Sequence, residues 1–154
     1  MRAELGEAPD QVRGTPSQAV TEGKRKMGIT PVKELVANAK AVITSVSTQE
    51  AEEMAAAGKA LLVDIRDPRE LTRDGRIPGA FHAPRGMLEF WIDPSSPYYK
   101  EALTTDKTLV FFCASAWRSA LTVKALQEMG VENLAEMEGG FSAWKEEDRA
   151  VEMS

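Results

Sequence analysis

Residues 108–119 read Thr108-Leu-Val-Phe-Phe112 followed by Cys113-Ala-Ser-Ala-Trp-Arg118-Ser119, and they contain the only cysteine of the chain. The apolar run over residues 108–112 has no polar alternation, which predicts a strand buried on both faces. A helical pattern follows over residues 119–129 and stops at Gly130. The sequence therefore places a thiol between a buried strand and the start of a helix.

This position favours a thiolate at Cys113. The start of a helix offers unpaired N–H groups and a partial positive charge, and Arg118 adds a full one. The small side chains of Ala114, Ser115 and Ala116 let successive N–H groups turn toward one point and form a nest for an anion. A cysteine after such an apolar run is, taken alone, more often a small buried apolar residue. The loop and Arg118 favour a nucleophile in an anion-binding loop.

An arginine at the start of a helix is unfavourable with respect to the helix dipole. Arg118 occupies that position in the predicted helix. An anionic ligand or a thiolate beside it would offset the cost. The placement therefore adds to the case for an anion site.

Strands and helices alternate on both sides of this stretch. The run from Ala60 to Ile65 predicts a second buried strand, and residues 133–137 predict a last one. Capping boxes at 47–50 and 67–70 predict helix starts, and a closing helix is expected after Gly139-Gly140. The pattern predicts an α/β domain with a mostly parallel sheet, whose ligands bind at the carboxyl ends of the strands.

The chain divides into three parts. Residues 1–28 have few large apolar side chains and several Gly and Pro residues, which predicts a disordered tail. Thr30-Pro31 predicts a short helix through about Ala39, so residues 29–45 are interpreted as an N-terminal helical extension. Residues 46–150 are interpreted as the folded domain, of a length that can build a core.

Composition excludes several classes of function. The formal net charge of -5 argues against a nucleic-acid binder. One cysteine excludes an internal disulfide, and one histidine with one cysteine excludes the usual structural zinc clusters. No metal and no organic cofactor is expected. No apolar stretch approaches the roughly 18 residues that span a membrane, and the N-terminus lacks a signal-peptide pattern. The single thiol suits a reducing compartment, and we expect the cytoplasm.

Four strings in order, over roughly residues 46–148, resemble the rhodanese (sulfurtransferase) family. They are Leu62-Val63-Asp64-Ile65-Arg66-Asp67-Pro68-Arg69-Glu70, then Gly75-Arg-Ile-Pro-Gly-Ala80 with His82-Ala83-Pro84, then Cys113-Ala-Ser-Ala-Trp-Arg118-Ser119-Ala120, and last Glu138-Gly-Gly-Phe141 with Ala143-Trp144. The resemblance implies a rhodanese-like α/β fold, with about five strands in a mostly parallel sheet and helices on both faces. It also implies that Cys113 becomes a persulfide.

The length of the loop bears on its chemistry. Related phosphatases of the same fold use a Cys-x5-Arg loop, whereas the spacing from Cys113 to Arg118 is Cys-x4-Arg, the form associated with sulfur transfer. A loop shorter by one residue is expected to fit a phosphoryl group poorly. Many family members have Gly where this chain has Ala116, and a positive φ there would cost alanine about 1 kcal/mol or more.

Further residues are assigned to the site by the resemblance. Ser119 and the loop residues from Ala114 to Trp117 are expected to bind substrate, with Trp117 either narrowing the site or packing against the sheet edge. Arg66 and Arg85 are expected near the same pocket, and a surface ion pair or a solvated arginine is the alternative for each. Asp64 is expected to support the loop through hydrogen bonds to its backbone, and His82 is interpreted as structural.

The expected activity is that of a sulfurtransferase with Cys113 and Arg118 as catalytic residues. The donor would be a small anion such as thiosulfate, and the acceptor a thiol or cyanide; a sulfur-acceptor protein is a further expected partner. Two alternatives stay open. One is a phosphatase or arsenate reductase that uses the same Cys–Arg pair, and the other is a non-catalytic rhodanese-like module that binds a protein.

Overall fold

The computed structural model describes residues 28–153 and has one sheet of five strands in the order β1-β5-β4-β2-β3. Every strand pairs with its neighbour in parallel. The predicted α/β class and the five-stranded parallel sheet are therefore confirmed. The predicted tail, apart from Gly28, lies outside the described residues. The strands are β1 (Ser45–Val46), β2 (Ala60–Asp64), β3 (Phe81–His82), β4 (Thr108–Phe112) and β5 (Leu134–Met137).

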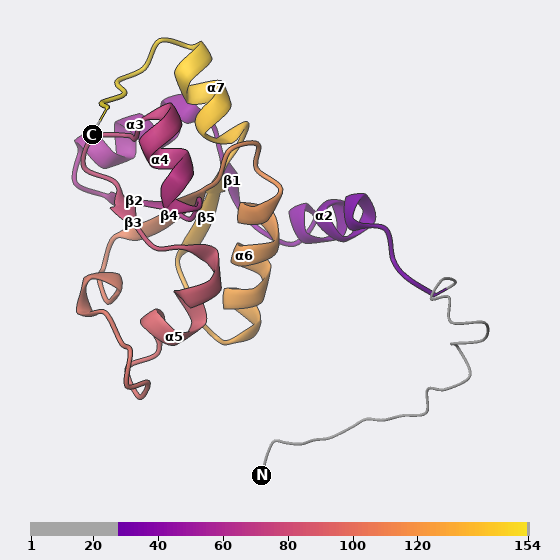
Figure 1. The fold of residues 1–154 in the computed structure, drawn as a ribbon. Helices are drawn as coiled ribbons and strands as arrows, with labels where there is room; N and C mark the ends of the chain where they lie inside the picture. The colour runs from indigo at the N-terminus through magenta and orange to yellow at the C-terminus, as the bar shows by residue number, and fades with distance from the viewer. Residues whose placement is uncertain (1–27, 154) are drawn as a thin grey trace. The chain divides into compact units, whose positions relative to one another are not determined.

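Helices cover both faces of the sheet. Figure 1 shows α3, α4 and α7 on one face and α5 and α6 on the other. The helices are α2 (Val32–Lys40), α3 (Thr48–Ala56), α4 (Pro68–Asp74), α5 (Leu88–Ile92), α6 (Arg118–Glu128) and α7 (Gly140–Glu146). Short 3-10 turns lie at Arg85–Met87 and Glu101–Leu103. Within residues 28–153, no helix is long and apolar enough to cross a membrane.

Both predicted capping boxes are present. Ser47 Oγ accepts from the N–H of Glu50, and the Glu50 carboxylate accepts from the N–H of Ser47, at the start of α3. Asp67 and Glu70 form the same reciprocal pair at the start of α4. Each box satisfies N–H groups that the first turn of a helix leaves unpaired. These local signals explain why the two helices begin where the sequence predicts.

The core lies on both faces of β4, because successive side chains of a strand point to opposite faces. Leu109 and Phe111 pack with the residues beneath α5 and α6, and Cys113 belongs to the same cluster. Val110 and Phe112 pack with the residues beneath α3 and α7. Burial on both faces explains the apolar run without alternation, and it places the thiol on the side of α6.

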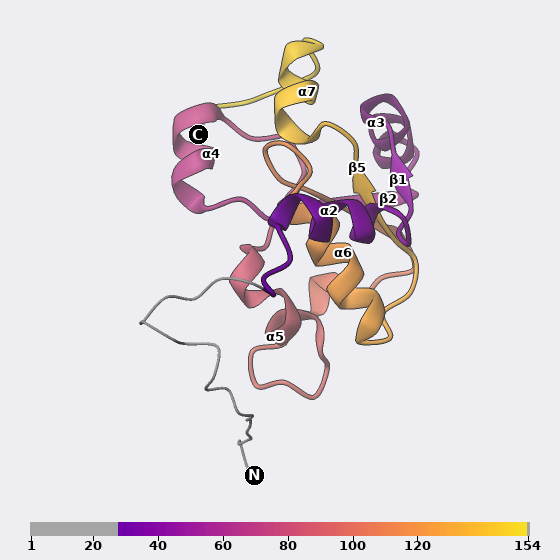
Figure 2. The same cartoon turned by 90° about the vertical axis from the view of Figure 1, so that its right-hand side faces the viewer.

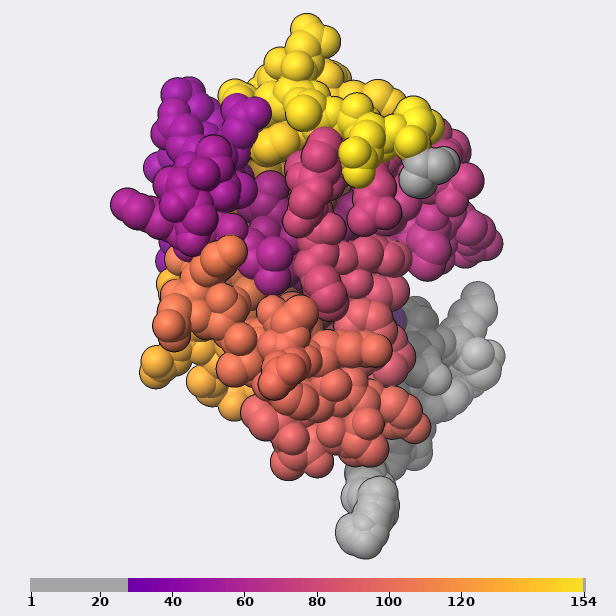
Figure 3. Space-filling view, turned by 90° about the vertical axis from the view of Figure 1, so that its left-hand side faces the viewer, coloured from indigo at the N-terminus to yellow at the C-terminus, as the bar shows by residue number. Residues whose placement is uncertain are grey.

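Two backbone pairings were not predicted from the sequence. The two-residue strand β1 forms the edge of the sheet beside β5 and begins one residue before the predicted domain boundary at 46. The backbone of Arg76 pairs with that of Glu152 near the C-terminus. Figure 3 shows that C-terminal segment, in yellow, beside the magenta residues that follow α4.

The predicted helix of the extension is present as α2, and it packs on α6. Val36 and Ala39 are buried together with Ala120. Figure 2 shows α2 lying across α6. The two alanines at this contact let the helices approach closely, and Lys40 at the end of α2 reaches Glu136 of β5.

The start of α7 holds the loop that follows β4. The N–H of Phe141 donates to the Cys113 carbonyl at 2.8 Å, and the N–H of Ser142 donates to the Ala114 carbonyl at 3.0 Å. Gly140 has φ +61, and a Cβ there would lie 2.5 Å from the Cys113 carbonyl oxygen. Only glycine fits this contact without displacing the loop.

Gly140→Ala is expected to destabilise the fold by about 3 kcal/mol or more, because the methyl group collides with backbone that cannot move aside. Gly58→Ala is the matched control, since Gly58 also has a positive φ of +75 but has nothing within 4 Å of an added Cβ. That variant is expected to lose only about 1 kcal/mol. Chemical denaturation of both variants measures the difference. Equal losses would show that α7 does not fix the loop.

Candidate functional site

The site lies where β2 and β4 end side by side. Asp64 and Phe112 are register partners, and the N–H of Ile65 donates to the Phe112 carbonyl at 3.0 Å. The chain after β2 and the chain after β4 therefore leave the sheet together. This is the carboxyl edge of a parallel sheet, where the sequence placed Cys113.

The Cys113 thiol lies inside its own loop. Its residue is 1% exposed, and the N–H of Ser119 donates to Sγ at 3.4 Å. The thiol donates to Ser119 Oγ, with 3.7 Å between sulfur and oxygen. A side chain and a backbone group at the start of α6 thus both contact the sulfur. The thiol is buried but not in a purely apolar environment.

The loop between Cys113 and α6 has unpaired backbone donors. The N–H groups of five successive residues have no acceptor among the described residues; they are those of Ala114, Ser115, Ala116, Trp117 and Arg118. A run of free N–H groups before a helix forms an anion-binding nest. The arrangement matches the loop that the sequence predicted.

Ala116 has φ +69, which lies in the left-handed region of backbone conformation. Its side chain is nevertheless buried, at 2% exposure. An alanine in this conformation carries a strain of about 1 kcal/mol or more. Ala116 therefore adopts the positive φ for which the sequence analysis expected this cost.

Arg118 is held by a carboxylate that the sequence analysis did not assign to the site. Its Nη1 donates to Glu70 Oε2 at 2.8 Å, and its Nη2 donates to Oε1 at 3.1 Å. The hydrogen bond that Arg118 donates to Glu70 raises the pKa of Arg118, with a smaller contribution from Cys113. Glu70 therefore offsets part of the unfavourable interaction between Arg118 and the helix dipole. The sequence analysis expected an anionic ligand or a thiolate to do this alone. Glu70 was predicted only as a capping residue.

Asp64 and Arg66 form a buried ion pair. Arg66 donates from Nε and Nη2 to both carboxylate oxygens of Asp64, and it donates from Nη2 to the Gly75 carbonyl at 2.8 Å. The prediction that Asp64 bonds to the loop backbone is wrong, because Arg66 folds back and takes both oxygens. Asp64 supports the loop indirectly, through Arg66. The Arg66 guanidinium lies 3.9 Å from the ring centroid of Phe141, and the N–H of Phe141 donates to the Cys113 carbonyl.

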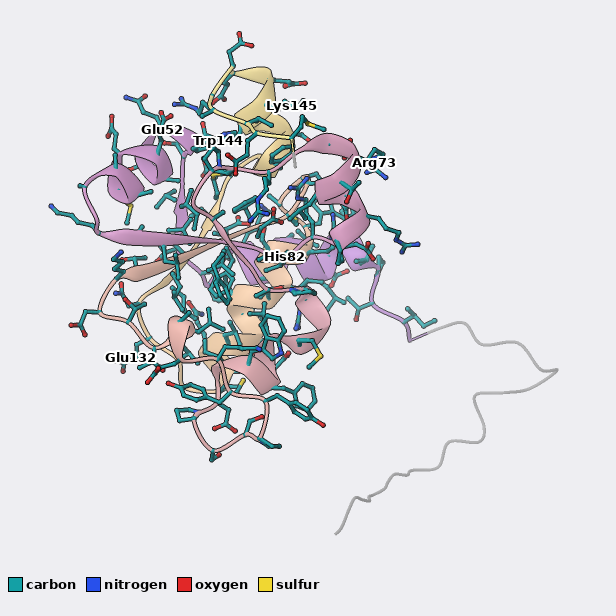
Figure 4. The ribbon with its side chains drawn as sticks, turned by 60° about the vertical axis from the view of Figure 1, so that its left-hand side comes forward. Glu52, Arg73, His82, Glu132, Trp144 and Lys145 are labelled. Carbon is teal, nitrogen blue, oxygen red and sulfur yellow. The ribbon has the colours of Figure 1, made fainter. Side chains whose placement is uncertain are left out.

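A cleft of about 340 Å³ adjoins this pair. Arg66 lines it although the residue is only 1% exposed, so its role in substrate binding stays a prediction. Figure 4 shows Lys145 of α7 on the same side as Arg73 of α4, and Lys145 Nζ donates to the Asp74 carbonyl. The full lining is Arg66, Asp74, Ala114, Phe141, Ser142, Lys145 and Glu146.

The other predicted residues occupy three different environments. Trp117 directly precedes α6 and is 44% exposed, so both its role in narrowing the site and its packing against the sheet edge stay predictions. Arg85 follows β3 and pairs with Glu89 at 2.8 Å, and its role in substrate binding stays a prediction. His82 Nε2 lies 2.7 Å from the Arg66 carbonyl oxygen, a structural contact.

In the described part of the chain, no group of three or more His, Cys, Asp or Glu residues could hold a metal ion.

Glu136 is a further residue that the sequence analysis missed. It is a fully buried carboxylate within β5, and its Oε1 accepts from Ser119 Oγ at 3.0 Å. The available signal was an acidic residue inside the apolar string Leu134-Ala-Glu-Met137. Such a residue rarely lies buried without a specific partner.

Comparisons with known proteins found a matching family model, similar sequences and similar folds. The model of the family described as the rhodanese-like domain matches residues 47–147. The human thiosulfate:glutathione sulfurtransferase is 27% identical over 110 residues, which cover 68% of this chain and 95% of that protein. An uncharacterized protein of Synechocystis is 35% identical over 86 residues, which cover 56% of this chain. The chain spans only 43% of the length of that relative.

A solved structure is similar to this chain over most of its length. It is a protein of unknown function from Rhodopseudomonas palustris, described as a possible tyrosine phosphatase. It is 44% identical with a TM-score of 0.79, and the match covers 84% of this chain and 100% of that one.

Replacing Glu70 with Gln is expected to lower stability at pH 7 by about 1 kcal/mol, because a partly exposed ion pair is lost. The hydrogen bond from Arg118 holds the pKa of Glu70 below its ordinary value of 4.5. A carboxyl with a lowered pKa contributes stability above pH 4.5 and loses it as the pH falls through the folded-state pKa. The difference between the wild type and Glu70→Gln should therefore shrink below pH 4.5.

Urea denaturation from pH 7 to pH 3 measures this difference. Glu128→Gln is the control, since Glu128 forms an exposed pair with Lys124 one helical turn away, worth about 0.5 kcal/mol or less. A difference between the wild type and Glu70→Gln that stayed constant down to pH 3 would contradict the assigned role of the pair.

Proposed function

We propose that this chain, which belongs to the rhodanese-like domain family, is a sulfurtransferase that carries a sulfane sulfur as a persulfide on Cys113. The observation that carries the proposal is the loop itself. A buried thiol, a Cys-x4-Arg spacing and five N–H groups without an acceptor in residues 28–153 occur in one short segment. Such donors stabilise negative charge on a sulfur that forms and loses bonds during a reaction.

The reaction has two half-steps. The Cys113 thiolate attacks the outer sulfur of thiosulfate; the new Sγ–S bond forms as the S–S bond of thiosulfate breaks, and sulfite leaves with the electron pair. A thiolate or cyanide then attacks the outer sulfur of the persulfide, and the Cys113 thiolate is released. A covalent intermediate of this kind gives ping-pong kinetics, and the two steps need no external oxidant or reductant.

Arg118 has a defined part in this scheme. Its guanidinium is anchored on Glu70 and remains 42% exposed. A fixed positive charge beside the sulfur favours both the thiolate and the negatively charged persulfide. Because Glu70 already fixes the orientation of Arg118, the side chain of Arg118 loses little conformational entropy when an anion binds.

The phosphatase alternative has one observation in its favour, the description of the Rhodopseudomonas palustris protein as a possible tyrosine phosphatase. Against it stands the short loop, which offers a narrower cradle than the Cys-x5-Arg loop expected for a phosphoryl group. Arsenate reduction by a thiol relay needs a resolving cysteine, and the sequence has only Cys113. A non-catalytic module would have no need of both Cys113 and Arg118.

The proposed substrates are small. The donor is an anionic sulfur compound such as thiosulfate, and the acceptor is a thiol, cyanide or a sulfur-acceptor protein. The human relative is named for transfer from thiosulfate to glutathione, which supports a thiol acceptor here. A reducing compartment, the cytoplasm, is the proposed location, because Cys113 must be free to react. The net charge of -5 does not favour a nucleic-acid partner.

Incubation with thiosulfate is expected to add the mass of one sulfur atom to the wild-type protein and none to Cys113→Ser. Cyanide should then remove the added sulfur and yield thiocyanate in equal amount, because the persulfide is the intermediate. Intact-protein mass spectrometry measures both steps. Absence of the adduct, together with Cys113-dependent hydrolysis of p-nitrophenyl phosphate, would establish the phosphatase alternative instead.

A further inference from the structure

Glu136 is a buried charge with a complete set of partners. It lies in the interior of β5 with 0% exposure, and Oε1 accepts from Ser119 Oγ at 3.0 Å. Oε2 accepts from Lys40 Nζ at 2.9 Å and from Ser45 Oγ at 3.0 Å. A carboxylate in the middle of a sheet is costly unless it is paired and hydrogen-bonded, so its retention calls for a reason.

Its hydrogen bonds lead to the nucleophile. The Cys113 thiol donates to Ser119 Oγ, and the Ser119 hydroxyl donates to Glu136 Oε1. Both donors point in the same direction, from the sulfur toward the carboxylate. The three groups come from the end of β4, the start of α6 and the interior of β5. They form one continuous path for a proton.

Within residues 28–153, the charged side chain that is bonded to Glu136 is that of Lys40. Lys40 reaches it from α2, and Ser45 of β1 and Ser119 of α6 provide the hydroxyl groups. Cys113 is the titratable group beyond Ser119. Lys40 and Ser45 both lie before residue 47, where the family model begins to match. The extension thus supplies a positive charge to the site.

A thiolate at Cys113 would be a second anion close to a buried carboxylate. Two like charges in one buried site disfavour each other unless one of them takes up a proton. Transfer of the thiol proton to Glu136 keeps the net charge of the pair constant, whereas its loss to solvent does not. The geometry provides the path for that transfer.

We propose that Glu136 is a positioning residue for Cys113 that receives the thiol proton through Ser119. The proton on sulfur passes to Ser119 Oγ while the hydroxyl proton of Ser119 passes to Glu136 Oε1. Cys113 is left as a thiolate, and Glu136 becomes neutral. Lys40 and Ser45 hold the carboxylate in place from its other oxygen. The inference rests on the proposed function only in taking the thiolate as the reactive form.

Alkylation of Cys113 by iodoacetamide between pH 5.5 and pH 9 tests the path, and it requires no sulfur donor. A failure of the proposed sulfurtransferase activity therefore leaves this measurement interpretable. In the wild type the rate is expected to change little through neutral pH, because the proton stays within the pair. In Glu136→Gln the rate at pH 7 is expected to fall about tenfold or more and to rise about tenfold per pH unit.

Two alternative roles give opposite results. If Glu136 acted only as a nearby negative charge, Glu136→Gln would favour the thiolate and speed the alkylation. If Glu136 were only structural, the rate and its pH profile would match the wild type in folded protein. Either result would overturn the proposal. Glu138→Gln is the matched control, since Glu138 is exposed and directly follows the same strand, and this variant is expected to leave the profile unchanged.

Ser119→Ala provides a second variant if Glu136→Gln does not fold, because it leaves the pairing of Glu136 with Lys40 and Ser45 intact. It interrupts the path at the hydroxyl, so the same slowing is expected. Where both variants fold, the double variant should be no slower than either single one, since all remove one path. Additive slowing, or a wild-type profile in Ser119→Ala, would show that no proton passes this way.

Discussion

The site depends on one constraint: the loop after β4 must keep its N–H groups unpaired and still hold one conformation. Free donors usually leave a loop poorly ordered, because hydrogen bonds are what fix its backbone. Here the carbonyl groups of Cys113 and Ala114 are bonded to the N–H groups at the start of α7. The loop is thus fixed through its acceptors, which leaves its donors available to an anion. Gly140 is required because the contact with α7 is so close.

Supports for the site come from both faces of the sheet. On the face of α4 and α7, Glu70 anchors Arg118, and Arg66 packs on Phe141. On the face of α6, Ser119 joins the thiol to Glu136. A nucleophile at the end of a central strand can use both sets of contacts, because the strand is buried on both sides. The same burial produces the apolar run by which the sequence reveals β4.

The elements set by local signals could be predicted. The buried runs of β2 and β4 and the two capping boxes each depend on neighbouring residues, and so does the spacing from Cys113 to Arg118. The two-residue strand β1 carries too few residues for a periodic signal, and it is a strand only because β5 lies beside it. Boundaries of this kind follow from tertiary pairing.

The partners of the site residues could not be predicted in the same way. Glu70 and Arg118 are separated by 48 positions, and Lys40 and Glu136 by 96. The sequence showed Glu70 as a cap and did not single out Glu136. Asp64 pairs with Arg66 and not with the loop, since side-chain direction at the end of a strand is decided by packing. The candidate catalytic residues Cys113 and Arg118 could be identified within one segment, whereas the residues that bond to them come from several elements of the fold.

A crystal structure of the protein after reaction with thiosulfate tests directly whether the loop holds a persulfide on Cys113. The expected result is density for one additional sulfur on Cys113 Sγ, enclosed by the loop, with N–H groups from Ala114 to Arg118 within hydrogen-bond distance of it and Arg118 still on Glu70. An outer sulfur that pointed away from these N–H groups, or an unmodified Cys113 with the anion bound elsewhere, would contradict the account.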